Sequence, residues 1–147
     1  MDTSFERIRT AVETAGYEAL RGVRDGTGTF VADGLRFAWE KRDDADEVVF
    51  YVSIGSLPPQ PSVPLCEYLL EQNCLGAATA GGHIGLYAPT RVLLYSFRTQ
   101  LDAVSPEALA NMLRAFVAKA TDLIADMQNL GSSQTSLMDF SGSMLWV

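Results

Sequence analysis

The sequence has 147 residues, 48% of them hydrophobic, with a formal net charge of −7 and a pI of about 4.5. This length suits one domain with a single hydrophobic core. Nucleic acids and anionic membrane surfaces are recognised through Lys and Arg, so the acidic balance argues against both as partners. It suits a soluble protein that binds basic or apolar segments of other proteins.

The chain shows no targeting signal, because a basic start followed by an apolar run is absent and no window is apolar for long enough to cross a bilayer. Its two cysteines, Cys66 and Cys74, form no CxxC pair and have no histidine cluster beside them. We expect reduced thiols in a cytoplasmic protein that holds no metal and no cofactor.

Hydrophobic periodicity predicts a helix over residues 3–15, followed by three strands. The apolar residues at helical spacing are Phe5, Ile8, Val12 and Ala15. From residue 27 onward the period changes to two, which predicts strands at 27–32, 35–40 and 48–54.

Two turns separate these strands. Asp33-Gly34 is a tight-turn signal. The acidic run Asp43-Asp44-Ala45-Asp46 lacks the ligand spacing and the glycine of a calcium loop. We therefore expect a solvated hairpin tip there, not a cation site.

The second half of the chain predicts a short helix, two strands and a long helix. Residues 64–73 form the short helix, and residues 84–88 and 92–97 form the strands. The long helix spans 105–130 and begins at Ser105, whose side chain can cap its first turn.

These elements predict an α+β fold, an antiparallel sheet of about five strands with three helices, in the order α-β-β-β-α-β-β-α. We expect a domain at 1–130 and, at 131–147, a Ser/Gly linker with an apolar C-terminal tail. The apolar residues of the tail are expected to dock on their own domain or on a neighbouring molecule. They are Leu137, Met138, Phe140, Met144, Leu145, Trp146 and Val147.

Motifs for catalysis are absent from the sequence. It contains no phosphate-binding GxGxxG or GxxxxGK(S/T) loop and no GxSxG nucleophile elbow. His83, the only histidine, does not share zinc-ligand spacing with Cys66 and Cys74. We therefore expect no enzymatic activity.

Apolar residues exceed what a small core needs. Both faces of the strands at 48–54 and 92–97 are apolar, and so is most of the helix at 64–73. This surplus can fill a core, or part of it can meet a second subunit or a peptide. The sequence leaves both alternatives open.

Residues 65–73 read Leu-Cys-Glu-Tyr-Leu-Leu-Glu-Gln-Asn, an apolar helix that ends in Leu-x-x-Asn before the fourth predicted strand. Residues 53–58 pass from small residues into Leu-Pro, and residues 109–123 form an apolar stripe with Phe116 and Val117 inside it. With the element order, these features resemble the class I chaperones of bacterial type III secretion, the Tir-chaperone-like family. The resemblance covers about residues 3–130.

The resemblance implies a homodimer that binds the extended N-terminal segment of a secreted effector protein and keeps it export-competent without catalysis. An extended segment can add a strand to a sheet edge and place apolar side chains in pockets. By resemblance, the dimer contact involves Leu65, Cys66, Tyr68, Leu69 and Leu70. The effector-binding candidates are Phe30, Leu35, Phe37 and Trp39, each of which can equally belong to the core.

Two other interpretations stay open. A chaperone-like regulatory or sensory interaction module, unrelated to secretion, would share the whole fold and differ only in its partner. A small enzyme or ligand-binding protein would instead gather polar groups in one apolar cavity.

Overall fold

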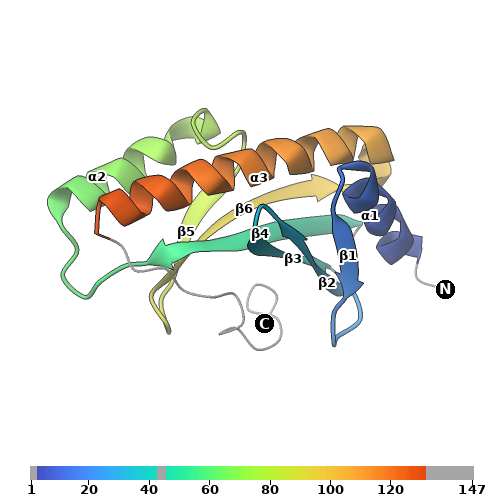
Figure 1. Cartoon of the computed structure of the whole chain (residues 1–147), viewed down its shortest axis with the longest axis horizontal. Helices are drawn as coiled ribbons and strands as arrows, with labels where there is room; N and C mark the ends of the chain where they lie inside the picture. Colours follow the sequence, from blue (N-terminus) through green and yellow to red (C-terminus); the bar gives the residue numbers. More distant parts are fainter. Residues whose placement is uncertain (1–2, 43–45, 132–147) are drawn as a thin grey trace.

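The computed structural model describes residues 3–42 and 46–131 as helices packed on one antiparallel sheet (Figure 1). The helices are α1 (Thr3–Thr14), α2 (Val63–Gln72) and α3 (Pro106–Asn129), with short 3-10 turns η1 (Cys74–Gly76) and η2 (Leu101–Ala103). The strands are β1 (Glu18–Arg21), β2 (Thr27–Ala32), β3 (Leu35–Lys41), β4 (Glu47–Ser56), β5 (His83–Tyr87) and β6 (Val92–Gln100). The predicted α+β class and element order are confirmed, with six strands in place of about five.

The additional strand is β1, which the sequence did not predict. It has four residues, and their burial does not alternate, since only the second of them is partly buried. Glu, Ala, Leu and Arg are also good helix formers, so local propensity points away from a strand. Pairing with β2, in which Glu18 lies opposite Val31 and Arg21 opposite Gly28, fixes the segment as a strand.

The sheet has the strand order β1-β2-β3-β4-β6-β5, and all neighbouring strands are antiparallel. Asp33 and Gly34 have φ values of 52° and 77°, as the predicted tight turn between β2 and β3 requires. The predicted acidic hairpin tip falls mostly at 43–45, outside the described residues. Its last residue, Asp46, accepts a hydrogen bond from Arg7 at 3.3 Å.

Helix α3 runs along the length of the sheet (Figure 1). The Ser105 hydroxyl accepts a hydrogen bond from the Ala108 N–H at 3.1 Å, and Pro106 stands in the first turn, so the predicted start is confirmed. Its buried stripe comprises Leu109, Ala110, Leu113, Phe116, Val117, Ala120, Leu123, Ile124 and Met127. At about 1.5 Å per residue the helix is long enough to cover the whole sheet.

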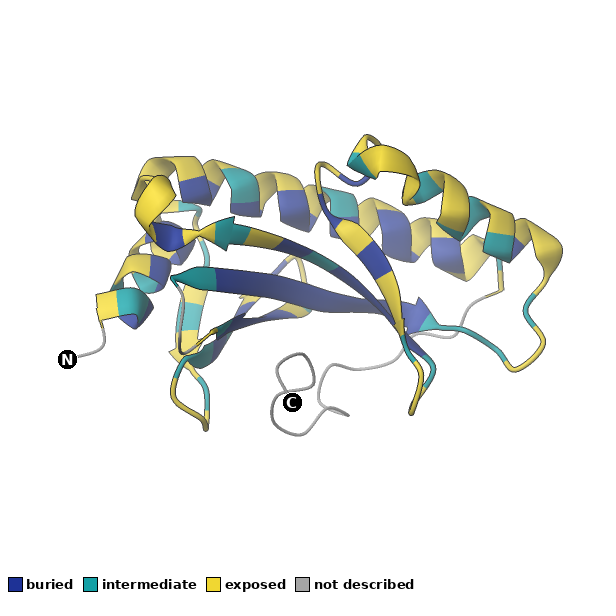
Figure 2. Cartoon of the chain, turned by 180° about the vertical axis from the view of Figure 1, so that it is seen from behind, coloured by how far each residue is buried: buried dark blue, intermediate teal, exposed yellow. Residues whose placement is uncertain are grey.

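The two faces of the sheet have different surroundings (Figure 2). One face packs against the helices, and the rings of Phe50, Phe97 and Phe116 lie there in contact, with centroid separations of 5.1 and 4.8 Å. The opposite face, called here the second face, carries a smaller cluster made only of strand residues. They are Ala38, Val49, Tyr51, Val92 and Leu94, with Tyr87 packed beside them.

None of the described helices is long and apolar enough to cross a membrane.

Candidate protein-interaction surfaces

The described part of the chain has several large apolar side chains exposed on its surface. Within residues 3–42 and 46–131, no three His, Cys, Asp or Glu side chains form a group that could hold a metal ion. His83 is exposed at the start of β5. The candidate sites described below are two apolar features of the surface and one edge of the sheet.

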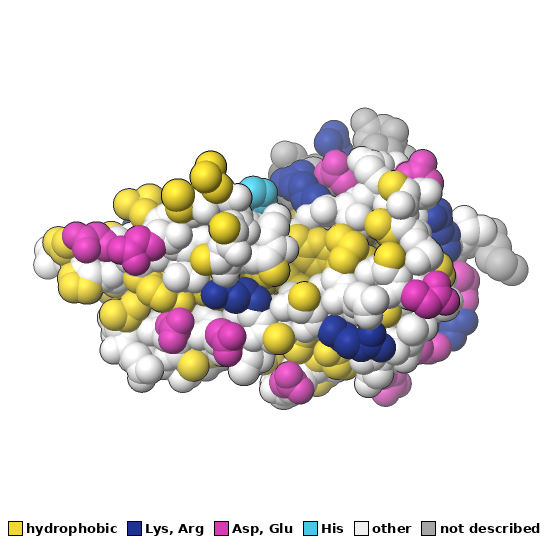
Figure 3. Space-filling model, turned by 90° about the horizontal axis from the view of Figure 1, so that it is seen from above, with side chains coloured by type: hydrophobic (Ala, Val, Ile, Leu, Met, Phe, Trp, Pro, Cys, Tyr) yellow, Lys and Arg dark blue, Asp and Glu magenta, His cyan; other side chains and the backbone are white. Residues whose placement is uncertain are grey.

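The first candidate is an apolar patch on α2 and the segment that follows it, called here the α2 surface. It consists of Val63 and Leu70 on α2, Leu75 in η1 and, on the edge strand β5, Leu86, whose exposed fractions are 67%, 73%, 98% and 43%. Seen from above, hydrophobic side chains gather over this end of the molecule (Figure 3). An exposed group of this size is typical of a surface that meets another protein.

One side of α2 is fixed to α3. Leu65 is 1% exposed, and the Tyr68 hydroxyl donates a hydrogen bond of 2.7 Å to Asp126. Burial, with Asp126 adding to it, raises the pKa of Tyr68 well above its ordinary value, so the hydroxyl keeps its proton and remains a donor. Lys119 adds a 3.0 Å hydrogen bond to Gln72. The opposite side of α2 is therefore held outward in a fixed orientation.

The five predicted dimer-contact residues occupy different positions on this helix. Leu65 is a core residue, and Cys66, Tyr68 and Leu69 are partly buried, the last two against the core. Leu70 is the one of the five that projects outward. The sequence missed Val63, Leu75 and Leu86, although Leu75, a leucine in a glycine-rich segment outside any apolar period, was a usable signal.

Asn73 connects α2 to the sheet. Its side-chain amide donates to the Ile84 carbonyl and accepts from the Ile84 N–H, each at 2.8 Å. The amide therefore pairs with β5 as a neighbouring strand would. This gives the asparagine of the Leu-x-x-Asn pattern a physical role, because it sets where the α2 surface stands relative to the sheet edge.

We expect Asn73→Ala to lower the free energy of unfolding by about 1–2 kcal/mol, because two hydrogen bonds are lost and water can replace them only in part. Amide hydrogen exchange should show faster exchange at Ile84. Asn129→Ala, at an exposed asparagine at the end of α3, is the matched control and should change neither quantity. Equal effects of the two variants would contradict the role of Asn73.

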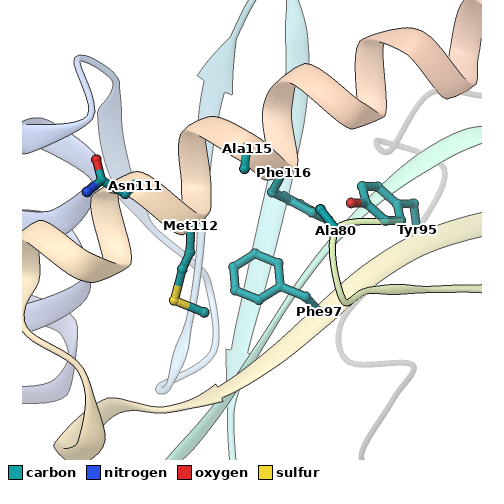
Figure 4. A pocket seen from close by; sticks show the side chains of 7 residues that line it. All are labelled: Ala80, Tyr95, Phe97, Asn111, Met112, Ala115 and Phe116. Carbon is teal, nitrogen blue, oxygen red and sulfur yellow. The ribbon is translucent and has the colours of Figure 1, made fainter. Parts of the chain in front are cut away.

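The second candidate is an open pocket of about 300 Å³ between α3 and β6, called here the α3–β6 pocket (Figure 4). Its lining residues are Ala80, Tyr95, Phe97, Asn111, Met112, Ala115 and Phe116. Phe116 lies 4.5 Å from Tyr95 and 4.8 Å from Phe97 between ring centroids, so the aromatic part of the lining is rigid. No lining residue carries a charge, which suits an apolar occupant.

Tyr95 holds one wall of this pocket in place. Its hydroxyl donates a 2.7 Å hydrogen bond to the Thr79 carbonyl, and Thr79 in turn donates to the Gly82 carbonyl at 2.6 Å. Burial raises the pKa of Tyr95 to about 12, so this donor is present throughout the physiological pH range. The loop that carries Ala80 is thereby fixed over β6.

The third candidate is the edge of the sheet at β1. β1 and β5 form the two edges of the described sheet. Asn73 already occupies the backbone of Ile84 at the β5 edge. In an antiparallel strand every second residue directs its N–H and C=O away from its partner strand, so β1 presents backbone groups to which an extended segment can pair.

The four predicted effector-binding residues are placed mostly inside the molecule. Phe30 and Phe37 are 0% exposed, and Trp39 is 1% exposed. Phe30 and Phe37 stack with centroids 5.0 Å apart, on the face of the sheet that the helices cover. These three residues are core residues here, whereas Leu35 is only partly buried.

An exposed apolar side of a helix, an uncharged pocket and a strand at the edge of the sheet are together typical of a protein-binding module. The chain belongs to the Tir chaperone protein (CesT) family, whose model matches residues 11–123. The family resemblance, which rested on the element order and on residues 53–58, 65–73 and 109–123, is therefore confirmed. A comparison with curated proteins finds no match.

Solved structures with a similar fold include chaperones bound to their partners. A chain of the heterodimeric ExoU–SpcU complex from the type III secretion system of Pseudomonas aeruginosa is 18% identical, with a TM-score of 0.64 over 80% of this chain and 95% of that chain. The Yersinia pestis type III secretion chaperone SycH, solved with a fragment of YscM2, gives 19% identity and a TM-score of 0.61 over 82% and 98%. A chain of the HopA1–SchA chaperone–effector complex is 13% identical, with a TM-score of 0.60 over 88% of this chain and 98% of that chain. At these identities the likeness shows a shared fold.

Proposed function

We propose that this protein is a type III secretion chaperone that binds the extended N-terminal segment of an effector and keeps it export-competent without catalysing a reaction. Family membership supports the chaperone role, and the complexes with similar folds support a protein ligand. We also propose that it acts in the cytoplasm as a homodimer, with residues 1–130 as the chaperone domain.

The α3–β6 pocket is the observation that carries the proposal. Its aromatic and aliphatic lining has no charge, so it can take an apolar side chain of a bound segment. Met112 is unbranched and polarisable, which lets one pocket accept side chains of different shapes. Full burial of a Leu or Phe side chain contributes about 1.5–3 kcal/mol, so a segment held by several such contacts would bind tightly.

Strand addition at β1 would supply the part of the affinity that does not depend on sequence. An extended segment pairs there through its backbone, while its alternate side chains enter pockets. Among the four predicted effector-binding residues, Leu35 stands nearest to the surface, at the start of β3. For Phe30, Phe37 and Trp39 we propose an indirect role, as the rigid layer beneath the β1–β3 strands.

We expect Ala115→Glu to weaken binding of an effector N-terminal segment by about tenfold or more, because a carboxylate in the pocket would have to be desolvated. Ala118→Glu is the matched control, since both alanines are exposed on α3 but only Ala115 lines the pocket. Isothermal titration calorimetry with each purified variant measures the difference.

The two variants have the same charge and the same helix propensity, so equal weakening by both would contradict the pocket as the binding site. If no secreted protein's N-terminal segment binds, and a cytosolic regulator binds in its place, the interpretation as a regulatory interaction module would replace the secretion chaperone. Pull-down of partners by the full-length protein under secretion-inducing conditions provides the candidates for this comparison.

A further inference from the structure

The second face of the sheet is buried although no described helix lies on it. Val49 and Val92 are each 1% exposed, Tyr51 is 5% and Leu94 is 7%. In an open sheet, neighbouring strands shield the flanks of a side chain but not its outer end, so an uncovered face stays in contact with water. Burial this complete requires a covering layer.

The described residues do not supply that layer. Across 3–42 and 46–131, the buried helical residues other than Ala110 belong to the core on the other face, and the cluster on the second face contains strand residues alone. Figures 1 and 2 show the three helices on the same side of the sheet. The covering layer must therefore come from a part of the assembly other than these elements.

Buried polar groups on the second face also indicate a covering layer. The Tyr51 hydroxyl donates a 3.0 Å hydrogen bond to Glu40, which is only 2% exposed. Ser53 is 5% exposed, and its hydroxyl is the buried side-chain atom for which the described chain shows no hydrogen-bond partner. A buried hydroxyl is normally satisfied, so the covering layer is expected to bring a polar backbone group to this point.

We propose that residues 132–147 of the same chain dock on the second face and form this layer. The segment begins directly after Gly131, at the end of α3, which lies above the end of β4 in both views (Figures 1 and 2). Its sixteen residues could extend for about 53 Å, at about 3.3 Å each. A sheet of six strands is about 24 Å wide, so the segment can reach all of the second face.

The composition of the segment fits this site. It includes seven apolar residues, two of them the aromatic residues Phe140 and Trp146, and the one acidic residue Asp139. Aromatic side chains of this size bury enough area to cover the central strands.

The α2 surface and the α3–β6 pocket lie elsewhere on the chain, so this docking leaves both available. The proposal is independent of effector binding and would hold even if the chaperone function failed its own test. It revises the division of the chain, because the segment after 131 becomes part of the folded domain.

Trp146 provides a direct probe, because Trp39 is the only other tryptophan. In the full-length Trp39→Phe variant we expect a blue-shifted Trp146 emission with weak acrylamide quenching. Adding Leu94→Lys should shift that emission to the red and raise quenching several-fold. Val23→Lys makes a comparable change at a fully exposed position and should leave both unchanged.

A second measurement requires no substitution in the second face. Methyl NMR of the unaltered full-length protein should show nuclear Overhauser contacts from Val49, Val92 and Leu94 to residues 132–147. In a sample that mixes differently labelled chains, these contacts should be within one chain. This measurement stands even if Leu94→Lys fails to fold.

Three results would overturn the proposal. The first is a Trp146 that is exposed to water in the full-length protein. The second is a shielded Trp146 without methyl contacts to Val49, Val92 or Leu94, which would place the segment elsewhere. The third is contacts that occur only between differently labelled chains, which would make a second copy the occupant.

Discussion

Gly28→Ala is expected to lower the free energy of unfolding by about 3 kcal/mol, at the upper end of the usual cost of overpacking a core. Gly28 lies opposite Trp39 in the β2–β3 pair, and the indole ring rests directly on the glycine backbone. A Cβ atom at position 28 would overlap the six-membered ring of that indole. Trp39 cannot move aside easily, because it also contacts Phe5 and Phe50 in the core. Urea denaturation followed by circular dichroism measures the loss.

Gly85→Ala in β5 is the control, because a Cβ there meets nothing within 4 Å and the backbone is not in the left-handed region. We expect this variant to stay within about 0.5 kcal/mol of the unaltered protein. Trp39→Phe removes the ring atoms that overlap, so it should recover part of the stability lost in Gly28→Ala. Two glycine variants of equal stability would contradict the proposed packing.

The sequence predicted those elements whose signals are local. Ser105 and Pro106 mark the start of α3 within two residues, and its apolar stripe, from Leu109 to Met127, repeats over about five turns. Asp33-Gly34 likewise determines its own turn, because both residues adopt the positive φ values that this turn requires. β1 was missed because four residues are too few to establish a period, and its strand conformation depends on β2. The contact of Gly28 with Trp39 is equally non-local, since it depends on the strand register.

The candidate sites were predicted less completely, for a related reason. Their hydrophobicity indicates that Phe30, Phe37 and Trp39 are buried away from water. It does not indicate whether they are buried in the core of their own chain or against a bound partner. The α3–β6 pocket combines residues of β6 and α3 with Ala80 from a loop, and only the folded chain shows that they leave a space between them. The residue pattern predicted the helix at 64–73, while the structure was needed to show which side of α2 faces outward.

Leu70→Asp is expected to raise the dissociation constant of the proposed homodimer by about a hundredfold or more. Leu70 is 73% exposed in the single chain, so an aspartate there is well solvated until two chains associate. A twofold interface contains the substitution twice, and each carboxylate would lose its water on association. Sedimentation velocity or light scattering across a dilution series measures the shift.

Two further aspartate substitutions separate association from folding. Leu65→Asp places the charge at a residue that is 1% exposed within the chain, so it should unfold the monomer and not merely divide the dimer. Leu20→Asp changes a half-exposed leucine of β1 and should leave the dimer intact. If Leu70→Asp remains dimeric at every concentration, the α2 surface is not the interface. If the Leu70→Asp dimer dissociates while the unfolding transition of the monomer is unchanged, Leu70 acts between chains. The apolar residues of α2 then fall into two groups, an inner side that stabilises the fold and an outer side that associates with a second chain.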